Sequence, residues 1–326
     1  MKIAILGSGR MGIIRAEVLS RAGVDLTIFN RTIEKVRPLA EQLDCAYSDF
    51  SKLTNEEFDG YVVSTSTKSH LDFLNQLIPL GKPILCEKPI SLNVEETDQV
   101  IADCKKYGTE IQVGFQRRFD PAMRSAEKMV RDGKVGTLYA MHLYAHDHLP
   151  ANPEFLEGSG SIFKDLHVHD FDIVRWITGE EIVKVYATHA VREHQQYAKF
   201  DDADVSLVSL TTSNGVQVAI TGTRHDPVGQ DVRFEIFGSK DSLAVGLNAK
   251  TPLHAIDSDL TFSDQPYKGF IERFQEAFEI ETQQFHKFVT GEIENPCPPF
   301  AARQALRVAI ACEESIRSGN SVSIPL

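Results

Sequence analysis

The chain has 326 residues, of which 42% are hydrophobic and 25% are charged, a composition typical of globular proteins. At roughly 100–200 residues per domain, this length allows two domains. The formal net charge of −12 argues against binding to nucleic acid or to an anionic membrane, since both need clustered lysine and arginine. We therefore expect small molecules as partners, with no nucleic acid and no membrane among them.

The five cysteines are widely spaced and contain no C-x-x-C pair. This spacing suggests neither a disulfide framework nor a structural zinc site, so we predict no metal and a reducing compartment. The apolar stretch at residues 3–6 is too short for a signal sequence or a membrane span. A cytoplasmic location follows as the expectation.

From residue 1 to about 118, short apolar runs alternate with segments of helical periodicity. Strands are predicted at Ile3–Leu6, Asp25–Phe29, Tyr61–Ser64, Pro83–Cys86 and Ile111–Phe115. Helices are predicted at Gly12–Arg21, Ile33–Leu43, Ser69–Leu80 and Val94–Lys106. This alternation indicates a parallel sheet with crossover helices, so residues 1–118 are expected to form a doubly wound Rossmann domain.

The pattern changes after a predicted bridging helix at Phe119–Arg131, where alternating strands follow one another without intervening helices. These strands are predicted at Leu138–Tyr144, Ile182–Val191, Ala203–Leu210, Val216–Thr223, Val232–Phe237 and Ser242–Val245. Asn214-Gly215 is a strong hairpin signal between two of them. With two closing helices at about Phe270–Val289 and Ala301–Ser318, residues 119–326 are expected to form an α/β domain with an open, mainly antiparallel sheet.

The run from Gly7 to Gly12 reads G-x-G-x-x-G, directly after a predicted strand and at the start of a predicted helix. In this context Gly7 permits a tight turn, Gly9 lets the backbone approach a pyrophosphate, and Gly12 allows close packing of helix on strand. We expect cofactor contacts from this loop, including Arg10 and Met11. The alternative is a glycine-rich turn that binds nothing.

At the end of the second strand stands Asn30-Arg31-Thr32, where NAD-binding proteins place an acidic residue. Without a carboxylate there, Arg31 can pair with a 2′-phosphate, while Asn30 and Thr32 can donate hydrogen bonds. This pattern favours NADP over NAD. Alternatively, Asn30 caps the helix beginning near Ile33 and contacts an unphosphorylated ribose. Ser64 and Thr65, where the strand beginning at Tyr61 ends, are further candidates for cofactor contact.

Glu87-Lys88-Pro89 follows the strand at Pro83–Cys86, so it falls at the carboxyl edge of the sheet, where open α/β folds bind ligands. Glu87 and Lys88 are therefore candidates for the cofactor site. Lys88 could hydrogen-bond a nicotinamide ribose and hold positive charge near a developing alkoxide. Standing alone, the tripeptide would be more ordinary as a solvated loop.

A Gly/Ser run at residues 158–161 precedes a segment rich in aspartate and histidine. On a single helix, Asp165, His169 and Asp172 would share one face at i, i+4 and i+7. His169 could then take a hydroxyl proton during oxidation and return it during reduction, with Asp165 stabilising the imidazolium. The alternative for an isolated helix histidine is a structural role.

Two further sets of side chains are candidates for substrate contact. Arg117 and Arg118 follow the strand at Ile111–Phe115 and could reach a substrate or form an interdomain ion pair. His146 and His148 follow a strand of the second domain and are favoured as surface-loop residues unless the loop turns toward the site.

Three features together resemble the Gfo/Idh/MocA oxidoreductase family over essentially the whole chain, and the inositol 2-dehydrogenase-like branch within it. They are G-x-G-x-x-G at 7–12, E-K-P at 87–89 and D-x-x-x-H-D-x-D at 165–172. The resemblance implies a Rossmann domain at 1–118 and a substrate-binding and oligomerisation domain at 119–326, whose open sheet is commonly used for dimer or tetramer contacts. A homodimer or homotetramer is thus expected.

The resemblance also implies roles at matching positions. Lys88 would contact cofactor and substrate, Asp165 would bind substrate, and His169 would be the catalytic base. Asp172, Arg118 and His148 would be further substrate ligands. Pro150 stands where some inositol enzymes place a polar ligand, and Asn30-Arg31 departs from the acidic NAD pattern.

The function predicted from these observations is hydride transfer between NAD(P) and a hydroxyl or carbonyl carbon of a cyclitol or sugar. One alternative is a dinucleotide-sensing regulator without catalysis, which would need neither Lys88 nor His169. Another is a zinc hydrolase, because His146-x-His148 and His167-x-His169 form two H-x-H pairs. Zinc needs three or four convergent ligands, and on a helix the second pair would diverge.

Overall fold

The computed structural model describes residues 1–54, 56–253 and 265–326, and the chain divides into two compact units. The first unit contains Met1–Gln116 and Glu276–Arg303, and the second contains Arg117–Gln275 and Gln304–Leu326. The predicted boundary between residues 118 and 119 lies close to the first of these divisions. A single boundary between two domains was predicted, but the structure differs, because Glu276–Arg303 belongs to the first unit.

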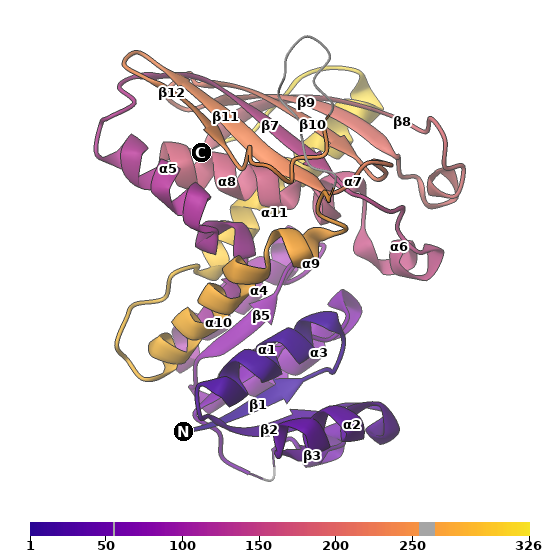
Figure 1. Ribbon diagram of the computed structural model, residues 1–326, viewed down its shortest axis with the longest axis vertical. Coiled ribbons are helices and arrows are strands. Elements are labelled where there is room, and N and C mark those ends of the chain that lie inside the picture. Colours follow the sequence, from indigo (N-terminus) through magenta and orange to yellow (C-terminus); the bar gives the residue numbers. More distant parts are fainter. Residues whose placement is uncertain (55, 254–264) are drawn as a thin grey trace. The chain divides into compact units, whose positions relative to one another are not determined.

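The first unit contains a six-stranded parallel sheet in the order β3-β2-β1-β4-β5-β6 (Figure 1). Its strands are β1 Lys2–Leu6, β2 Asp25–Phe29, β3 Ala46–Ser48, β4 Gly60–Val63, β5 Ile84–Glu87 and β6 Ile111–Gly114. The predicted Rossmann fold is confirmed, with its change of direction between β1 and β4. The sequence missed β3 because this three-residue edge strand buries none of its side chains fully and so has no apolar run.

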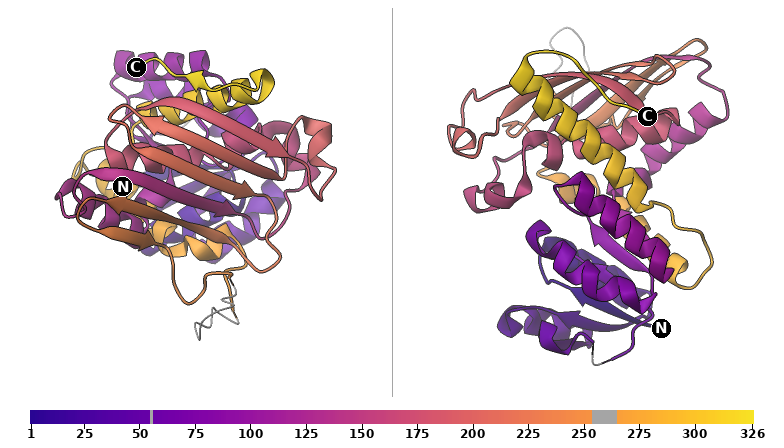
Figure 2. Two further views of the ribbon diagram at one scale, coloured as in Figure 1. Left: turned by 90° about the horizontal axis from the view of Figure 1, so that it is seen from above. Right: turned by 180° about the vertical axis from the view of Figure 1, so that it is seen from behind.

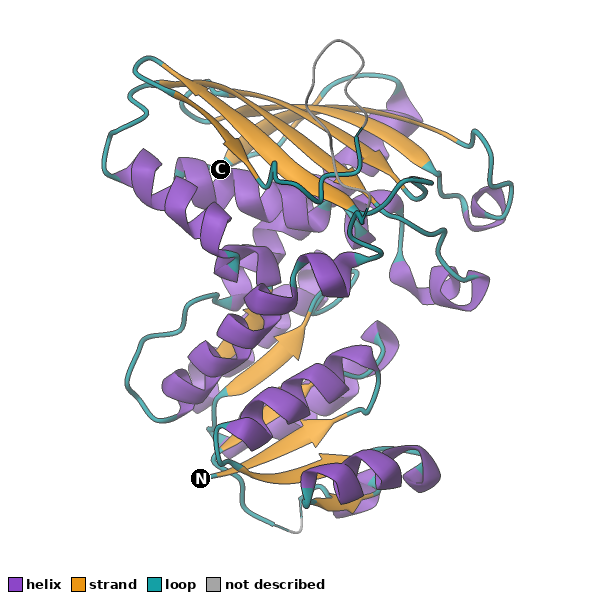
Figure 3. Ribbon diagram, in the orientation of Figure 1, coloured by secondary structure: helices purple, strands orange, loops and turns teal. Residues whose placement is uncertain are grey.

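Helices connect these strands (Figure 3). They are α1 Arg10–Arg21, α2 Ile33–Leu43, α3 His70–Leu77 and α4 Val94–Tyr107, with short 3-10 turns η1 Phe50–Lys52, η2 Thr67–Ser69, η3 Ile78–Leu80 and η4 Gln116–Phe119. From Glu276 on, α10 (Gln275–Val289) belongs to the same unit. Phe285 and Phe288 of α10 lie in one buried cluster with Ile3 and Ile5 of β1. Burial of these rings is the physical reason why a distant segment joins the Rossmann fold.

The second unit contains a seven-stranded sheet in the order β12-β11-β7-β10-β9-β8-β13. Its strands are β7 Leu138–His146, β8 Ile182–Ala190, β9 Val205–Thr212, β10 Gln217–Thr223, β11 Asp231–Gly238, β12 Ser242–Val245 and β13 Val322–Ser323. The sheet is mainly antiparallel, as predicted, although β7 and β10 pair in parallel. The hairpin at Asn214-Gly215 is confirmed: it joins β9 to β10, and Gly215 has φ +92°.

Helices cover one face of this sheet, and the other face carries no helix among the described residues (Figure 2). The helices of the unit are α5 Pro121–Arg131, α6 Pro153–Ser159, α7 Ile162–Asp165, α8 Val168–Thr178, α9 Phe270–Arg273 and α11 Pro299–Ser318 from Gln304 on, with a 3-10 turn η5 at Tyr197–Phe200. On the open face, Tyr186 and Leu207 leave 45% and 55% of their surface exposed. Across the described parts of the chain, no helix is long and apolar enough to cross a membrane.

The segment carrying Asp165 and His169 is not one helix, which corrects the predicted continuous face. Asp165 ends α7, and α8 begins three residues later at Val168. At the break, the backbone N–H of His167 donates to the carbonyl of Ile162 at 3.0 Å, five residues back, so the α-helical ladder is interrupted. The i, i+4 relation between Asp165 and His169 therefore does not hold as helix geometry.

Candidate active site

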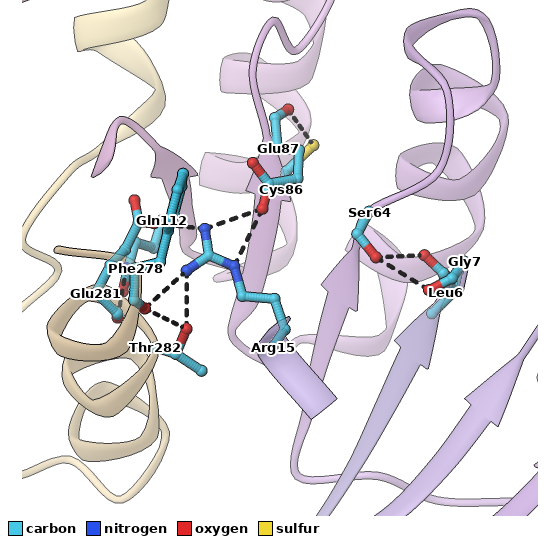
Figure 4. Close-up of polar contacts among 10 residues, drawn as sticks. All are labelled: Leu6, Gly7, Arg15, Ser64, Cys86, Glu87, Gln112, Phe278, Glu281 and Thr282. Carbon is cyan, nitrogen blue, oxygen red and sulfur yellow. Dashed lines mark hydrogen bonds and ion pairs between the residues drawn. The ribbon is translucent and has the colours of Figure 1, made fainter. Parts of the chain in front are cut away.

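The glycine loop between β1 and α1 is shaped by contacts that leave no room for side chains at two positions. Gly7 has φ +99°, and a Cβ there would lie 2.9 Å from the carbonyl oxygen of Ser64. A Cβ on Gly12 would lie 2.0 Å from the carbonyl oxygen of Gly7. The Ser64 hydroxyl donates a hydrogen bond to this loop, with its Oγ 3.0 Å from Leu6 O and 3.2 Å from Gly7 O (Figure 4). Ser64, predicted as a cofactor contact, therefore supports the loop itself.

Gly9 behaves differently from its two neighbours in the motif. It is the N-cap of α1, and a Cβ added there would meet no heavy atom within 4 Å. The space beside Gly9 thus opens at the N-terminus of a 12-residue helix, where backbone N–H groups and the helix dipole favour a phosphate. Arg10 and Met11 begin this helix. The residues present fit the pyrophosphate of a dinucleotide.

The residues after β2 form a short turn into α2. The side-chain amide of Asn30 donates to the carbonyl of Thr32 at 3.0 Å, and Thr32 is the N-cap of α2. The alternative in which Asn30 caps the helix is therefore wrong, since its side chain braces the turn instead. Arg31, between them, is exposed.

The E-K-P segment is anchored by a buried arginine that the sequence analysis did not single out. Arg15 of α1 donates to Glu87 through Nε at 3.1 Å and Nη2 at 2.9 Å, and also pairs with Glu281 of α10 (Figure 4). Its Nη1 donates to the Thr282 hydroxyl at 2.8 Å. The signal was present in the sequence, because Arg15 occupies the buried face of α1 with Gly12, Ala16 and Leu19.

The Arg15 guanidinium thus pairs with two carboxylates, those of Glu87 and Glu281, and the sharing affects the protonation of Glu281. Complete burial raises the pKa of Glu281 to about 7, and the nearby charge of Glu87 adds to the rise, while Arg15 opposes it. A proton on Glu281 leaves Arg15 and Glu87 as a balanced ion pair directly before Lys88. Arg15 therefore links Glu87, directly before Lys88, to a titratable group on α10.

His70 connects the same segment to the end of β4. Its Nδ1 lies 2.8 Å from the carbonyl oxygen of Pro89, and its Nε2 lies 3.2 Å from that of Thr65. Burial lowers the pKa of His70, so the neutral ring donates one hydrogen bond, for which the shorter contact to Pro89 is the better acceptor. The Lys88–Pro89 peptide bond is cis.

In the second unit, Asp165 is held by Arg224, a residue that the sequence analysis also missed. Arg224, just after β10, is 1% exposed and donates to Asp165 at 3.0 Å and to Asp202 at 2.9 Å. Asp202 in turn accepts the backbone N–H of Ile162 at 2.7 Å, so the two ends of α7 are tied to one guanidinium. No local pattern reveals this pairing, because its members are distant in the sequence.

Asp172 and Arg118, both predicted substrate ligands, form an ion pair with each other. Arg118 Nε and Nη2 donate to the two carboxylate oxygens of Asp172 at 2.7 and 2.6 Å. The side chain of Asp172 is 1% exposed and that of Arg118 is 11% exposed. This fork geometry fixes the orientation of both groups.

Arg117 pairs with the buried carboxylate of Asp170. Both residues lie in the second unit, so the predicted alternative of an interdomain ion pair is wrong for Arg117. Asp170 also accepts a contact from His167 Nδ1 at 2.8 Å, and His167 Nε2 lies 2.7 Å from the Ser206 hydroxyl. Although burial acts to raise it, Arg117 and His167 hold the pKa of Asp170 below its usual value. His167 is therefore part of the interior.

His169 lies in the first turn of α8 and is 8% exposed. His146 lies in β7, with Nε2 3.1 Å from the Thr221 hydroxyl, while His148 contacts the carbonyl of Asp226 through Nδ1 at 3.1 Å. In the part of the chain that the structure describes, neither H-x-H pair belongs to a cluster of three possible metal ligands. The geometry thus offers no support for the zinc hydrolase alternative.

Comparisons with known proteins agree with these two units. Residues 1–115 match the family model described as an oxidoreductase family with an NAD-binding Rossmann fold, and residues 123–244 match the Gfo/Idh/MocA C-terminal domain. The uncharacterised oxidoreductase YrbE of Bacillus subtilis is 31% identical over 98% of this chain and 95% of its own. The chain belongs to the Gfo/Idh/MocA oxidoreductase family. The predicted family and oxidoreductase class are confirmed.

Other members of the Gfo/Idh/MocA family match over nearly their full length. Myo-inositol 2-dehydrogenase of Thermotoga maritima is 29% identical over 99% of this chain and 98% of its own. The crystal structure of a myo-inositol dehydrogenase from Corynebacterium glutamicum superposes with a TM-score of 0.91 at 30% identity, covering 100% of this chain and 99% of that one. The full coverage shows that both units are those of the family.

Proposed function

We propose that this Gfo/Idh/MocA protein is an inositol dehydrogenase-like enzyme that oxidises a hydroxyl group of a cyclitol or sugar, or reduces the corresponding carbonyl. The observation that carries the proposal is the second unit. There, buried or nearly buried charged groups of the predicted substrate set are held by specific partners, Asp165 by Arg224 and Asp172 by Arg118. Such preorganised polar groups suit a ligand with many hydroxyls. The similarity to inositol dehydrogenases extends over nearly the whole chain, which supports the same substrate class.

The roles follow from chemistry and from the family resemblance. The bound nicotinamide supplies a hydride acceptor or donor. His169 removes the substrate hydroxyl proton during oxidation and returns it during reduction, which suits an imidazole at neutral pH. Lys88 holds positive charge beside the oxygen on which negative charge develops. Asp165, Arg118 and His148 bind and orient the substrate, and buried Asp172 orients Arg118.

The cofactor preference is a finer part of the proposal. We infer that NADP(H) is preferred over NAD(H), because exposed Arg31 follows β2 and no carboxylate there would repel a 2′-phosphate. The Asn30 amide braces the turn that carries Arg31, which supports this role. Arg31→Ala is expected to weaken NADP binding far more than NAD binding, as measured by the two dissociation constants. If the unmodified protein binds NAD more tightly, or if both cofactors weaken equally, the 2′-phosphate role is wrong.

Assembly and location complete the proposal. The open face of the second unit's sheet exposes Tyr186 and Leu207, which supports a homodimer or homotetramer formed through this face. All five cysteines are free thiols, four of them buried, which supports a reducing compartment such as the cytoplasm. Light scattering of the purified protein tests the assembly, and a monomer at micromolar concentration would contradict it.

A turnover screen tests the function itself. The purified protein is supplied with cyclitols, aldoses and ketoses, each with NAD(H) and with NADP(H), and the change in reduced cofactor is followed by absorbance. We expect turnover with at least one cyclitol or sugar. Binding of cofactor without turnover of any compound would favour the dinucleotide-sensing regulator instead.

A further inference from the structure

A group of three possible metal ligands lies in the second unit, outside the site described above. Glu193 and His194 follow β8, and His225 follows β10. One ligand atom from each of the three residues can be chosen so that all three atoms lie within 4.8 Å of one another. The sequence predicted no metal site, because its cysteines form no zinc motif and neither H-x-H pair supplies three convergent ligands, and His225 is distant from His194 along the chain.

The backbone that carries these three side chains is held by a single residue, Asp204. Its carboxylate accepts the backbone N–H groups of Arg192, Glu193 and His194 at 2.7, 2.8 and 2.9 Å. Its carbonyl accepts the N–H of Arg224, directly before His225, at 2.9 Å. Both ligand-bearing segments are therefore positioned relative to each other before any ligand binds.

The three side chains face one another without bonding to one another. Glu193 Oε2 lies 3.5 Å from His225 Nδ1 and 3.9 Å from His194 Nε2, and neither contact is a hydrogen bond. The two imidazole rings meet edge to face, with centroids 4.9 Å apart. His194 Nε2 is buried and has no hydrogen-bond partner among the described residues. A buried polar atom without a partner is costly, and a metal ion is one group that could satisfy it.

The spacing suits a small transition-metal ion. Zinc binds nitrogen and oxygen at about 2.0–2.2 Å, so the ligand atoms of a tetrahedral site are about 3.3 Å apart. Glu193 Oε2 is 3.5 and 3.9 Å from the two imidazole nitrogens, and all three ligand atoms lie within 4.8 Å of one another. Rotation of exposed Glu193 and of the partly exposed imidazoles can close the remaining difference. Calcium and magnesium would prefer oxygen ligands throughout.

We propose that Glu193, His194 and His225 form a binding site for a divalent transition-metal ion of the zinc class. Two imidazoles and one carboxylate supply three ligands, which leaves a fourth position for water or for an oxygen of another molecule. None of these three residues is among those proposed above to bind the substrate or to transfer its proton. The inference does not depend on the proposed function.

Cobalt(II) tests the proposal directly, because its visible absorption reports tetrahedral coordination by nitrogen and oxygen. Tag-free, full-length protein is stripped of metal and titrated with Co²⁺, and Zn²⁺ is then added. We expect one equivalent of Co²⁺ to give tetrahedral visible bands that Zn²⁺ abolishes. His225→Ala and Glu193→Gln should each weaken Co²⁺ affinity by roughly tenfold or more, since even residues outside the ligand shell are worth 10–100-fold.

The chain offers a matched control in His142, whose Nδ1 lies 3.7 Å from Glu235 on the open sheet face without a second histidine in the cluster. His142→Ala should leave Co²⁺ binding unchanged. Thermal unfolding of each variant without metal confirms that the fold is kept, and excess Zn²⁺ should raise the midpoint only where the site is intact. Absence of stoichiometric binding in the unmodified protein, binding retained in both site variants, or an equal loss in His142→Ala would each overturn the proposal.

Discussion

The two units organise their functional residues in different ways. In the first unit, Gly7, Gly9 and Gly12 of the dinucleotide loop lie within six residues between a strand and a helix, and Ser64, at the end of β4, packs against the loop. In the second unit, Asp165 depends on Arg224, and Asp172 depends on Arg118. These partners are far apart in the sequence and meet only when the sheet and helices of that unit have formed.

This difference indicates what each unit can tolerate. A local glycine loop can lose ligand affinity without losing its fold, provided that the altered position faces open space. Loss of one partner from a buried long-range ion pair should alter both the geometry of the site and the stability of the fold, because the other charge is left without compensation. Variants in both units test this contrast.

His169→Ala should lower turnover by roughly 10²–10⁴-fold, the usual scale for loss of a positioned proton-transfer group. Cofactor affinity should change little, since the dinucleotide loop lies in the first unit. Oxidation by the unmodified protein should fall at low pH, and that limb should vanish in the variant. Exposed His189→Ala is the control and should keep both turnover and pH profile. A destabilised His169→Ala protein that retains the acid limb would refute the catalytic role.

Arg224→Met should destabilise the protein by about 3–5 kcal/mol, because it leaves Asp165 and Asp202 in or near the interior without their shared cation. Urea unfolding measures the change. Arg131→Met is the matched control: its pair with Glu127 on α5 is exposed, so its loss should cost less than about 1 kcal/mol. Equal effects of the two variants would show that Arg224 does not hold α7 as described.

Gly12→Ala and Gly9→Ala separate packing from binding within one motif. The added methyl group at Gly12 would lie 2.0 Å from Gly7 O, so we expect a loss of about 1–3 kcal/mol in the free energy of unfolding. At Gly9 the methyl group enters open space, so stability should be nearly unchanged while cofactor affinity falls. Isothermal titration with cofactor and thermal unfolding of both variants measure this. Unaltered cofactor affinity in Gly9→Ala would place the pyrophosphate elsewhere.

Glu281→Gln should change how stability depends on pH. The folded state raises the pKa of Glu281 from 4.5 to about 7, so between these values the folded protein holds a proton that the unfolded chain has released. Stability contributed by this proton is present below about 4.5 and is lost as the pH rises toward 7, at no more than about 1.4 kcal/mol per pH unit. The glutamine keeps the protonated form's shape without titrating. The difference in stability between the two proteins should therefore vary across this window and become constant above it.

Glu279 provides the control for that experiment, because its pair with Arg21 links α10 to α1 at the surface. Glu279→Gln should leave the pH dependence between 4.5 and 7 as in the unmodified protein. A Glu281→Gln protein whose pH dependence matches the unmodified one would show that this carboxyl group does not bind a proton in the window.

Much of the first unit was predictable because its signals are periodic and local. Helix α2 spans Ile33–Leu43, as its apolar periodicity predicted. Strand β2 spans Asp25–Phe29, as its short apolar run predicted. Prediction failed where a segment has little burial of its own, as in β3, or where a helix is interrupted, as between Asp165 and Val168. Periodicity cannot detect a single irregular turn, because the side chains on both sides keep helical spacing in the sequence.

The sequence by itself determined the Rossmann fold, the sheet of the second unit and the identity of the glycine loop, because each depends on contacts between residues close together or on a repeated pattern. Only the tertiary structure decided that α10 completes the first unit, that Arg15 serves both Glu87 and Glu281, and that Arg224 holds Asp165. These pairings depend on which distant segments come together when apolar surface is buried. A charged residue in a sequence does not show its partner, because desolvation makes the pairing necessary only after the core has formed around both.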